Sequence, residues 1–385
     1  MKEENFYMLA KTMYGLEEIL ADELRTLGAQ NVKIQNRAVS FKGDTGFMYK
    51  ANLNLRTCLR ILKPIATFQA HNEKELLEKI TKIDWSKFLD VNMTFSTSAT
   101  TNSEVFTHSK YASLLVKDGI ADFFRNKYDK RPNVDPKNAD LTVDLHIAKH
   151  TCTLSLDSSG YSLHKRGYKS NTVVAPMNEV LAAGLILLSG WNQVSDFHDP
   201  MCGSGTILIE AALIANNIPV NIFREKFGFD SWKDYDEELF ELIRDSSLNK
   251  EKEYKGKITG GDNFQKAVRM TRENIENALM FENIKVKNED FFETKISPNT
   301  FVLFNPPYGE RIELGMNEFY EKVGNSLKNN YQDCDVWLIS SDIENLKMIG
   351  LKPNKKIKVM NGKLECSFRK FEVYQGSKKA SKSKY

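Results

Sequence analysis

Two kinds of hydrophobic pattern divide the chain near residue 160. Before this point, short runs that alternate between hydrophobic and polar residues are mixed with helical repeats. In one of these, GLEEILADELRTLG, leucine or isoleucine recurs at helical spacing, and Gly28 is expected to end the helix. After it, short apolar runs alternate with longer helical repeats, the order strand, helix, strand that is typical of a parallel sheet covered by helices. We therefore expect an α+β amino-terminal region followed by an α/β domain.

The amino-terminal region is expected to contain two α+β segments. Strands at 6–9, 32–34 and 38–41 flank the helix at 14–28, and a second segment has helices at 74–80 and 110–125 with strands at 93–99, 141–147 and 152–156. His146, His150 and Cys152 lie close enough in sequence to suggest a metal ion. A hairpin turn between two alternating strands explains them better, so we expect no metal.

The second half predicts a Rossmann-like sheet of seven strands. Strands are expected at 194–198, 257–259, 285–287, 300–304 and 336–340, separated by helices at 207–216, 265–280 and 318–329. Segments 355–360 and 364–374 flank Asn361-Gly362, a dipeptide typical of type I′ hairpin turns, so the last strand should be antiparallel. Class I methyltransferases share this topology, an argument from association alone.

A glycine-containing loop follows the first of these strands. Its sequence DPMCGSGT leads straight into a helix, and glycine lets the backbone approach a ligand closely at the carboxyl ends of the strands. Acidic residues also follow the second and third strands, where one can bind the ribose hydroxyls and the next the adenine amine. The expected cofactor residues are Asp199, Pro200, Cys202, Gly203, Gly205, Thr206, Asp262, Asn263, Asp290 and Phe291, with Phe291 or Phe292 packing on the adenine.

A nicotinamide dehydrogenase is the main alternative for this loop. The dinucleotide fingerprint requires a third glycine, but Thr206, Ile207 and Leu208 follow Gly205. No basic residue is available there for a pyrophosphate. The loop therefore favours S-adenosylmethionine.

The fourth strand ends in Asn305-Pro306-Pro307-Tyr308, the expected catalytic motif. Two prolines fix the backbone and remove two N–H donors, so the Asn305 side-chain oxygen and the Pro306 carbonyl could accept both hydrogens of an exocyclic amine. Such bonds draw the nitrogen lone pair out of conjugation with the base and towards the methyl donor. Tyr308 would stack on an extruded base.

These motifs together resemble the N6-adenine and N2-guanine branch of class I methyltransferases. The upstream sequence FTHSKYASLLVKDGIADFF, with LHKRGYK and APMNEVLAA, is similar to a THUMP domain fused to such an enzyme, as in bacterial 23S rRNA guanine-N2 methyltransferases. The resemblance implies a ferredoxin-like segment at 1–62, an RNA-binding THUMP domain at 63–158, a methyltransferase domain at 159–375 and a basic tail at 376–385. Some relatives carry a second methyltransferase domain and methylate two sites. Because one such domain is expected in this sequence, we expect it to methylate a single site.

The resemblance also implies an RNA contact before the first strand of the methyltransferase domain. Lys165, Arg166, Tyr168 and Lys169 form a local basic patch with one aromatic ring, suited to phosphate and stacking. The expected substrate is guanine N2 in large-subunit rRNA, with transfer RNA or adenine N6 left open. The segment between residues 218 and 256, rich in aromatic and acidic residues, is a candidate substrate lid.

Composition and cysteines limit the other classes. With 41% hydrophobic residues and a net charge of +3 the chain is an ordinary globular protein, so nucleic acid must bind through local patches. We identify no signal peptide or membrane span and expect a cytoplasmic enzyme without an obligate protein partner. Open alternatives are a C5 methyltransferase using Cys202 or Cys366, a DNA adenine methyltransferase, and a non-catalytic RNA-binding assembly factor.

Overall fold

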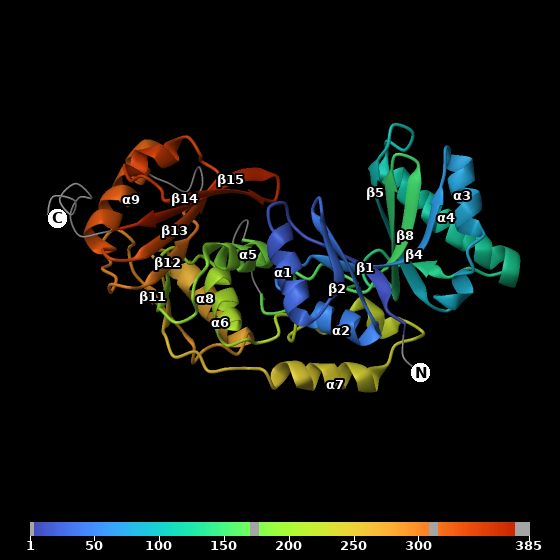
Figure 1. The fold of residues 1–385 in the computed structure, drawn as a ribbon, viewed down its shortest axis with the longest axis horizontal. Coiled ribbons are helices and arrows are strands. Elements are labelled where there is room, and N and C mark those ends of the chain that lie inside the picture. Colours follow the sequence, from blue (N-terminus) through green and yellow to red (C-terminus); the bar gives the residue numbers. More distant parts are fainter. Residues whose placement is uncertain (1–3, 170–176, 308–314, 374–385) are drawn as a thin grey trace. The chain divides into compact units, whose positions relative to one another are not determined.

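The structure is a computed structural model that describes residues 4–169, 177–307 and 315–373, in two compact units (Figure 1). The first unit is formed by Met1–Thr12, Leu20–Leu163 and Arg224–Ser246. The second is formed by Met13–Ile19, His164–Phe223 and Ser247–Tyr385. Within the described ranges no helix is both long and apolar enough to cross a membrane.

One eight-stranded sheet, in the order β2-β3-β1-β4-β8-β7-β5-β6, runs through the first unit. Its strands are β1 (Phe6–Lys11), β2 (Gln30–Gln35), β3 (Ala38–Gly43), β4 (Arg60–Gln69), β5 (Thr94–Asn102), β6 (Asn133–Val134), β7 (Leu141–Ala148) and β8 (Thr151–Asp157). Strand β4, which the hydrophobic pattern did not predict, pairs with β1 on one side and β8 on the other. The expected boundary between residues 62 and 63 therefore falls inside a strand that both segments share.

Helices of this unit pack on one face of the sheet. They are α1 (Glu17–Leu27), which also reaches into the second unit, α2 (Thr45–Asn54), α3 (Glu73–Thr81) and α4 (Ser109–Tyr128). Phe47 of α2 makes an edge-on ring contact with Phe41 of β3, and the Thr97 hydroxyl of β5 donates to the Ser113 carbonyl of α4 at 2.9 Å. Gly28 ends α1 at a positive φ of 104°, as its sequence predicts.

Most of the candidate lid at 218–256, namely Arg224–Ser246, is part of the first unit. The guanidinium of Arg224 donates to the carbonyls of Ser159 and Tyr161 at 3.0 Å each and lies 3.7 Å from the centre of the Tyr161 ring. Two rings from the same segment, Phe229 before α7 (Glu237–Leu248) and Phe240 within it, pack on Tyr49 of α2. Residues 224–246 therefore complete the core of the first unit, and the lid interpretation is not supported.

The second unit contains the predicted seven-stranded sheet, in the order β11-β10-β9-β12-β13-β15-β14. The strands are β9 (Phe197–Asp199), β10 (Ile258–Asp262), β11 (Ile284–Asn288), β12 (Phe301–Phe304), β13 (Asp335–Ser340), β14 (Lys355–Asn361) and β15 (Leu364–Glu372), and the main helices are α5 (Glu179–Ser189), α6 (Thr206–Ala215), α8 (Gln265–Asn277) and α9 (Met316–Asn330). Strands β9 to β13 are parallel and β15 is antiparallel to β13. The fold class predicted from the sequence is confirmed.

The hairpin between β14 and β15 differs from the prediction by one residue. Asn361 pairs with Leu364, so the turn residues are Gly362 and Lys363 rather than Asn361 and Gly362. Only Gly362 has a positive φ, at 62°, which is the pattern of a type II′ turn with glycine at its first central position. The predicted hairpin is confirmed, and the predicted type I′ turn is wrong.

Candidate active site

Three segments of the predicted site follow parallel strands that end at one edge of the sheet. Asp199 pairs with Gly260, two residues before Asp262, and His198 pairs with Val302, three residues before Asn305. Strand β12 is fully buried and anchors the segment after it. The register therefore brings the glycine loop, the acidic loop after β10 and the proline motif to the same edge.

Two side chains of helix α8 form hydrogen bonds to the backbone of the glycine loop. The Thr271 hydroxyl donates to the Gly203 carbonyl at 2.8 Å, and the Asn274 amide donates to the Ser204 carbonyl at 2.9 Å. At Gly205 φ is +79° and a Cβ would lie 2.6 Å from the Thr271 methyl carbon, so only glycine fits. Thr271 and Asn274 were not predicted from the sequence. Their helical spacing from Val268 and Ile275 places them on the apolar stripe of α8, and this is the signal that could have found them.

The N–H groups of the glycine loop bond within the protein. Gly203 donates to the Asp262 carboxylate at 3.0 Å, Cys202 to the Gly261 carbonyl at 2.9 Å and Gly205 to the Cys202 carbonyl at 2.8 Å. A dinucleotide-binding loop instead directs such groups at a pyrophosphate. This geometry argues against the dehydrogenase alternative.

A buried aspartate, Asp199, and a half-buried one, Asp262, are the acidic groups of the site. Burial raises the pKa of Asp199 well above its usual value, and the nearby Asp262 raises it further; burial also raises the pKa of Asp262. Each oxygen of Asp262 accepts one backbone N–H, from Gly203 and from Phe264, which leaves lone pairs for two hydroxyl groups. Ribose hydroxyls and a positively charged sulfonium fit these acidic acceptor groups, whereas an anionic phosphate does not.

The remaining residues predicted for the cofactor loops lie in differing environments. Pro200, Cys202 and Thr206 are buried, and the Thr206 hydroxyl lies 3.3 Å from that of Ser204. Asn263 is exposed. Because Pro200, Cys202 and Thr206 are buried, their side chains pack beneath the glycine loop and support its shape.

The acidic loop after β11 is placed as expected, but its aromatic residue is not. Asp290 is half-buried and accepts the Phe292 N–H at 2.7 Å. The Phe291 ring is only 4% exposed and stacks on Tyr331 in the core, with 5.0 Å between ring centres. The prediction that this ring packs on adenine is therefore not supported, since a ring buried in the core has almost no exposed surface for a ligand. The sequence analysis overlooked Phe264, which is 59% exposed and directly follows the acidic loop of β10.

The proline motif begins one residue after β12. Asn305 and Pro307 are half-buried and Pro306 is buried. Tyr308 lies outside the described residues. The described part of the motif is thus fixed at the edge of the sheet beside the glycine loop.

The predicted RNA-contacting patch is mostly buried. The Arg166 guanidinium and the Glu210 carboxylate of α6 are fully buried with 3.4 Å between them, and the Tyr168 hydroxyl donates to the same carboxylate at 3.1 Å. Lys169 pairs with Glu179 at 3.0 Å, and only Lys165 is exposed. The prediction is wrong for Arg166, Tyr168 and Lys169, because the buried Glu210 carboxylate needs the first two as partners, the buried Glu179 carboxylate needs the third, and these pairs hold all three away from solvent.

Cysteine chemistry receives no support. All five cysteines are buried, and burial raises the pKa of both Cys202 and Cys366. A nucleophilic cysteine requires access and a lowered pKa. The C5 methyltransferase alternative is therefore disfavoured.

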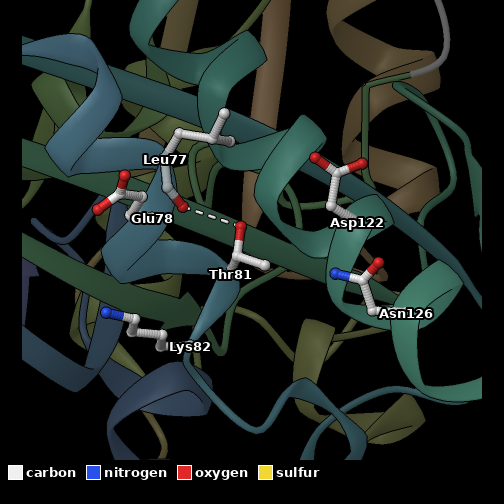
Figure 2. A pocket seen from close by; sticks show the side chains of 6 residues that line it. All are labelled: Leu77, Glu78, Thr81, Lys82, Asp122 and Asn126. Atoms are coloured by element: carbon white, nitrogen blue, oxygen red, sulfur yellow. Dashed lines mark hydrogen bonds between the residues drawn. The ribbon is translucent and has the colours of Figure 1, made fainter.

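A shallow hollow on the first unit lies between α3 and α4 and has a different character. Figure 2 shows it lined by Leu77, Glu78, Thr81, Lys82, Asp122 and Asn126. Two carboxylates against one lysine make it unsuited to phosphate. We assign it no part in the chemistry.

Comparisons with known proteins agree with this geometry. The family described as RMKL-like, methyltransferase domain, matches residues 166–370, the RlmL ferredoxin-like domain matches 7–62, and the THUMP domain matches 70–157.

Individual relatives cover most of the chain. A provisionally named RNA methyltransferase of Synechocystis is 34% identical over 94% of this chain and 95% of its own length. The ribosomal RNA large subunit methyltransferase K/L of Syntrophotalea carbinolica is 33% identical over 93% of this chain, which spans about half (52%) of that relative. Among solved structures, SMU.472, provisionally named a methyltransferase and crystallised with S-adenosylhomocysteine, has a TM-score of 0.85 at 27% identity, covering 98% of this chain and all of its own.

Proposed function

Because this chain belongs to the RMKL-like methyltransferase family, we propose that it methylates the exocyclic N2 of a guanine in large-subunit ribosomal RNA. It is an RNA methyltransferase whose cofactor is S-adenosylmethionine. The base, the atom and the RNA are the parts we propose. The observation that supports methylation of an exocyclic amine is the position of Asn305 and Pro306 at the sheet edge that also holds Asp199 and Asp262, and the relatives support the choice of guanine and of large-subunit RNA.

The proposed reaction needs little acid–base chemistry from the protein. S-adenosylmethionine would supply an electrophilic methyl group, with S-adenosylhomocysteine as the leaving group when the carbon–sulfur bond breaks. The Asn305 side-chain oxygen and the Pro306 carbonyl would accept the two hydrogens of the guanine amine, which makes its lone pair available for attack. Once the nitrogen has bonded to carbon it is acidic, so its proton can leave to water.

The cofactor would lie along the loops already described. Asp262 would hold the ribose hydroxyls, Asp199 and the Gly203 backbone the methionine end, and Asp290 the adenine amine. We propose Phe264 in place of Phe291 for the face of the adenine, since its ring is exposed and its N–H is bonded to Asp262 at 2.9 Å.

Replacing Phe264 by alanine should weaken cofactor binding. Loss of a stacking contact of about 1 to 1.5 kcal/mol corresponds to roughly a tenfold higher Kd. Isothermal titration with S-adenosylhomocysteine measures it, and Phe281→Ala is the matched control because that ring is 61% exposed and follows α8 rather than the acidic loop. Equal affinities for both variants would remove Phe264 from the site.

Guanine is preferred to adenine on family grounds only, because either base presents an amine that the same turn could hold. The name of the Syntrophotalea relative supports large-subunit RNA over transfer RNA. Matches at 7–62 and 70–157 likewise support the domain extents expected from the sequence, which we retain as a proposal.

Nucleoside mapping tests the target directly. RNA from a strain lacking the gene, separated into ribosomal and transfer fractions, is digested and compared with wild type by mass spectrometry. We expect one N2-methylguanosine to disappear from large-subunit RNA and to return when purified protein and S-adenosylmethionine are added. Loss of N6-methyladenosine, or loss from transfer RNA alone, would overturn the assignment. A chain that transfers no labelled methyl group to any RNA would instead be the assembly factor.

A further inference from the structure

The face of the first unit's sheet that lies opposite the helices is exposed along β5, β7, β8 and β4, except at the buried Asp144 and Ser155. Strand residues alternate between two faces, and Phe41 and Thr97 mark the face that contacts α2 and α4. On the other face Ser98, Thr100 and His146 are exposed, as are Thr67 and Gln69 of β4.

Short polar side chains form three rows across β5, β7, β8 and β4. The pairing register lines them up as Asn102, Ala148, Thr151 and Gln69; Thr100, His146, Thr153 and Thr67; and Ser98, Asp144, Ser155 and Pro64. Eight of these twelve positions carry a hydroxyl or an amide. We call them the hydroxyl face.

The acidic charge on this face is neutralised. Asp144 is 6% exposed, pairs with Lys11 at 2.9 Å and accepts the Ser98 hydroxyl at 2.8 Å. Beyond the opposite row, the exposed Lys149 lies in the turn after β7, where its N–H donates to the Asn102 carbonyl. The exposed part of the face is therefore lined by neutral donors and acceptors, with Lys149 at one end, whereas the helical side carries Glu78 and Asp122 (Figure 2).

We propose that the hydroxyl face binds the sugar–phosphate backbone of the substrate RNA. Hydroxyl and amide groups can donate to phosphate oxygens and exchange hydrogen bonds with 2′-hydroxyls, contacts that read shape rather than sequence. Short side chains lose little rotamer freedom when they are fixed, so such contacts cost less than those of long charged residues. Absence of an exposed carboxylate among the twelve positions avoids repulsion of phosphate. The inference rests on the proposed function, because it needs RNA as the substrate.

Cross-linking from a single introduced cysteine tests directly whether RNA contacts the hydroxyl face. Because all five natural cysteines are buried, a cysteine introduced in place of Thr100 can be labelled selectively with a maleimide photocross-linker in the full-length protein. The control is Asn126→Cys, an exposed position on α4 beside the acidic hollow. With protein-free large-subunit RNA from the gene-deletion strain as probe, we expect cross-links from position 100 and at most a few per cent of that yield from position 126. Equal yields would overturn the inference.

Affinity provides the second measurement. Thr100→Glu should weaken binding of the same RNA about tenfold, the loss of one charge-assisted contact, while Asn126→Glu stays within twofold and both keep the wild-type melting temperature and affinity for S-adenosylhomocysteine. Unchanged RNA affinity in Thr100→Glu, or a change in its oligomeric state, would refute this surface. Either result leaves the proposed function intact as long as the wild type still methylates the RNA, whereas failure of the wild type refutes that function itself.

Discussion

Replacing Asn305 by alanine should lower the rate of methyl transfer by a factor of about 10² to 10³ while cofactor affinity stays within about twofold. This is the usual effect of removing one group that binds the reacting atoms more strongly in the transition state than in the ground state. Asn305 directly follows the buried strand β12, whereas the cofactor is expected to lie along the glycine loop, whose N–H groups bond to Asp262, Gly261 and Cys202. Single-turnover transfer of labelled methyl groups to RNA from the deletion strain measures the effect.

Asn305→Asp is the informative companion. The carboxyl group of this variant retains an oxygen that accepts a hydrogen bond, so we expect the variant to keep at least a tenth of the wild-type rate of methyl transfer. Asn305→Leu, which has a similar volume and no acceptor, should fall below that rate. If alanine and leucine variants keep more than a third of the wild-type rate, Asn305 does not hold the reacting amine.

Arg166→Ala should cost about 3 to 5 kcal/mol of the free energy of unfolding, because it leaves the Glu210 carboxylate buried without its cation. The expected loss is one of stability and not of RNA affinity. Denaturant unfolding of the full-length protein measures the free energy of unfolding. S-adenosylhomocysteine is left out of the samples, because its binding would stabilise the folded state and mask the loss of stability.

Lys165→Ala is the matched control, since Lys165 is adjacent in sequence but exposed; its free energy of unfolding should change by less than about 0.5 kcal/mol. Arg166→Met combined with Glu210→Met should lose less than the two single variants added together, because neither charge then remains buried alone. Should Arg166→Ala unfold like the wild type yet bind RNA poorly, the original sequence interpretation would stand after all.

Strands, helices and the proline motif were predictable because each depends on residues that are neighbours in sequence. The run FVLF followed by Asn305 and two prolines identifies a buried strand and its rigid end without any tertiary information. The register that brings Asn305 beside Asp199 also follows from the alternation of strands and helices. Strand β4, with half-exposed residues on both faces and Pro64 within it, has no such periodic signal.

Burial of polar and aromatic residues was not predictable. Arg166 and Tyr168 look like a basic, RNA-contacting patch until Glu210, more than forty positions later, is placed against them. Phe291 and Phe264 both follow acidic loops, and only the packing of Tyr331 shows which ring belongs to the core. In each case the deciding partner is distant in sequence.

Residues 224–246 also set an order of folding during synthesis. The first unit draws Phe229 and Phe240 from a segment that the ribosome makes only after the first strand and first helix of the methyltransferase sheet. At about 5 to 20 residues per second, the chain from residue 163 to 246 takes roughly 4 to 17 s to emerge. Until then Tyr49 lacks the rings of Phe229 and Phe240, so the core of the first unit stays incompletely packed while the ribosome makes the start of the methyltransferase domain.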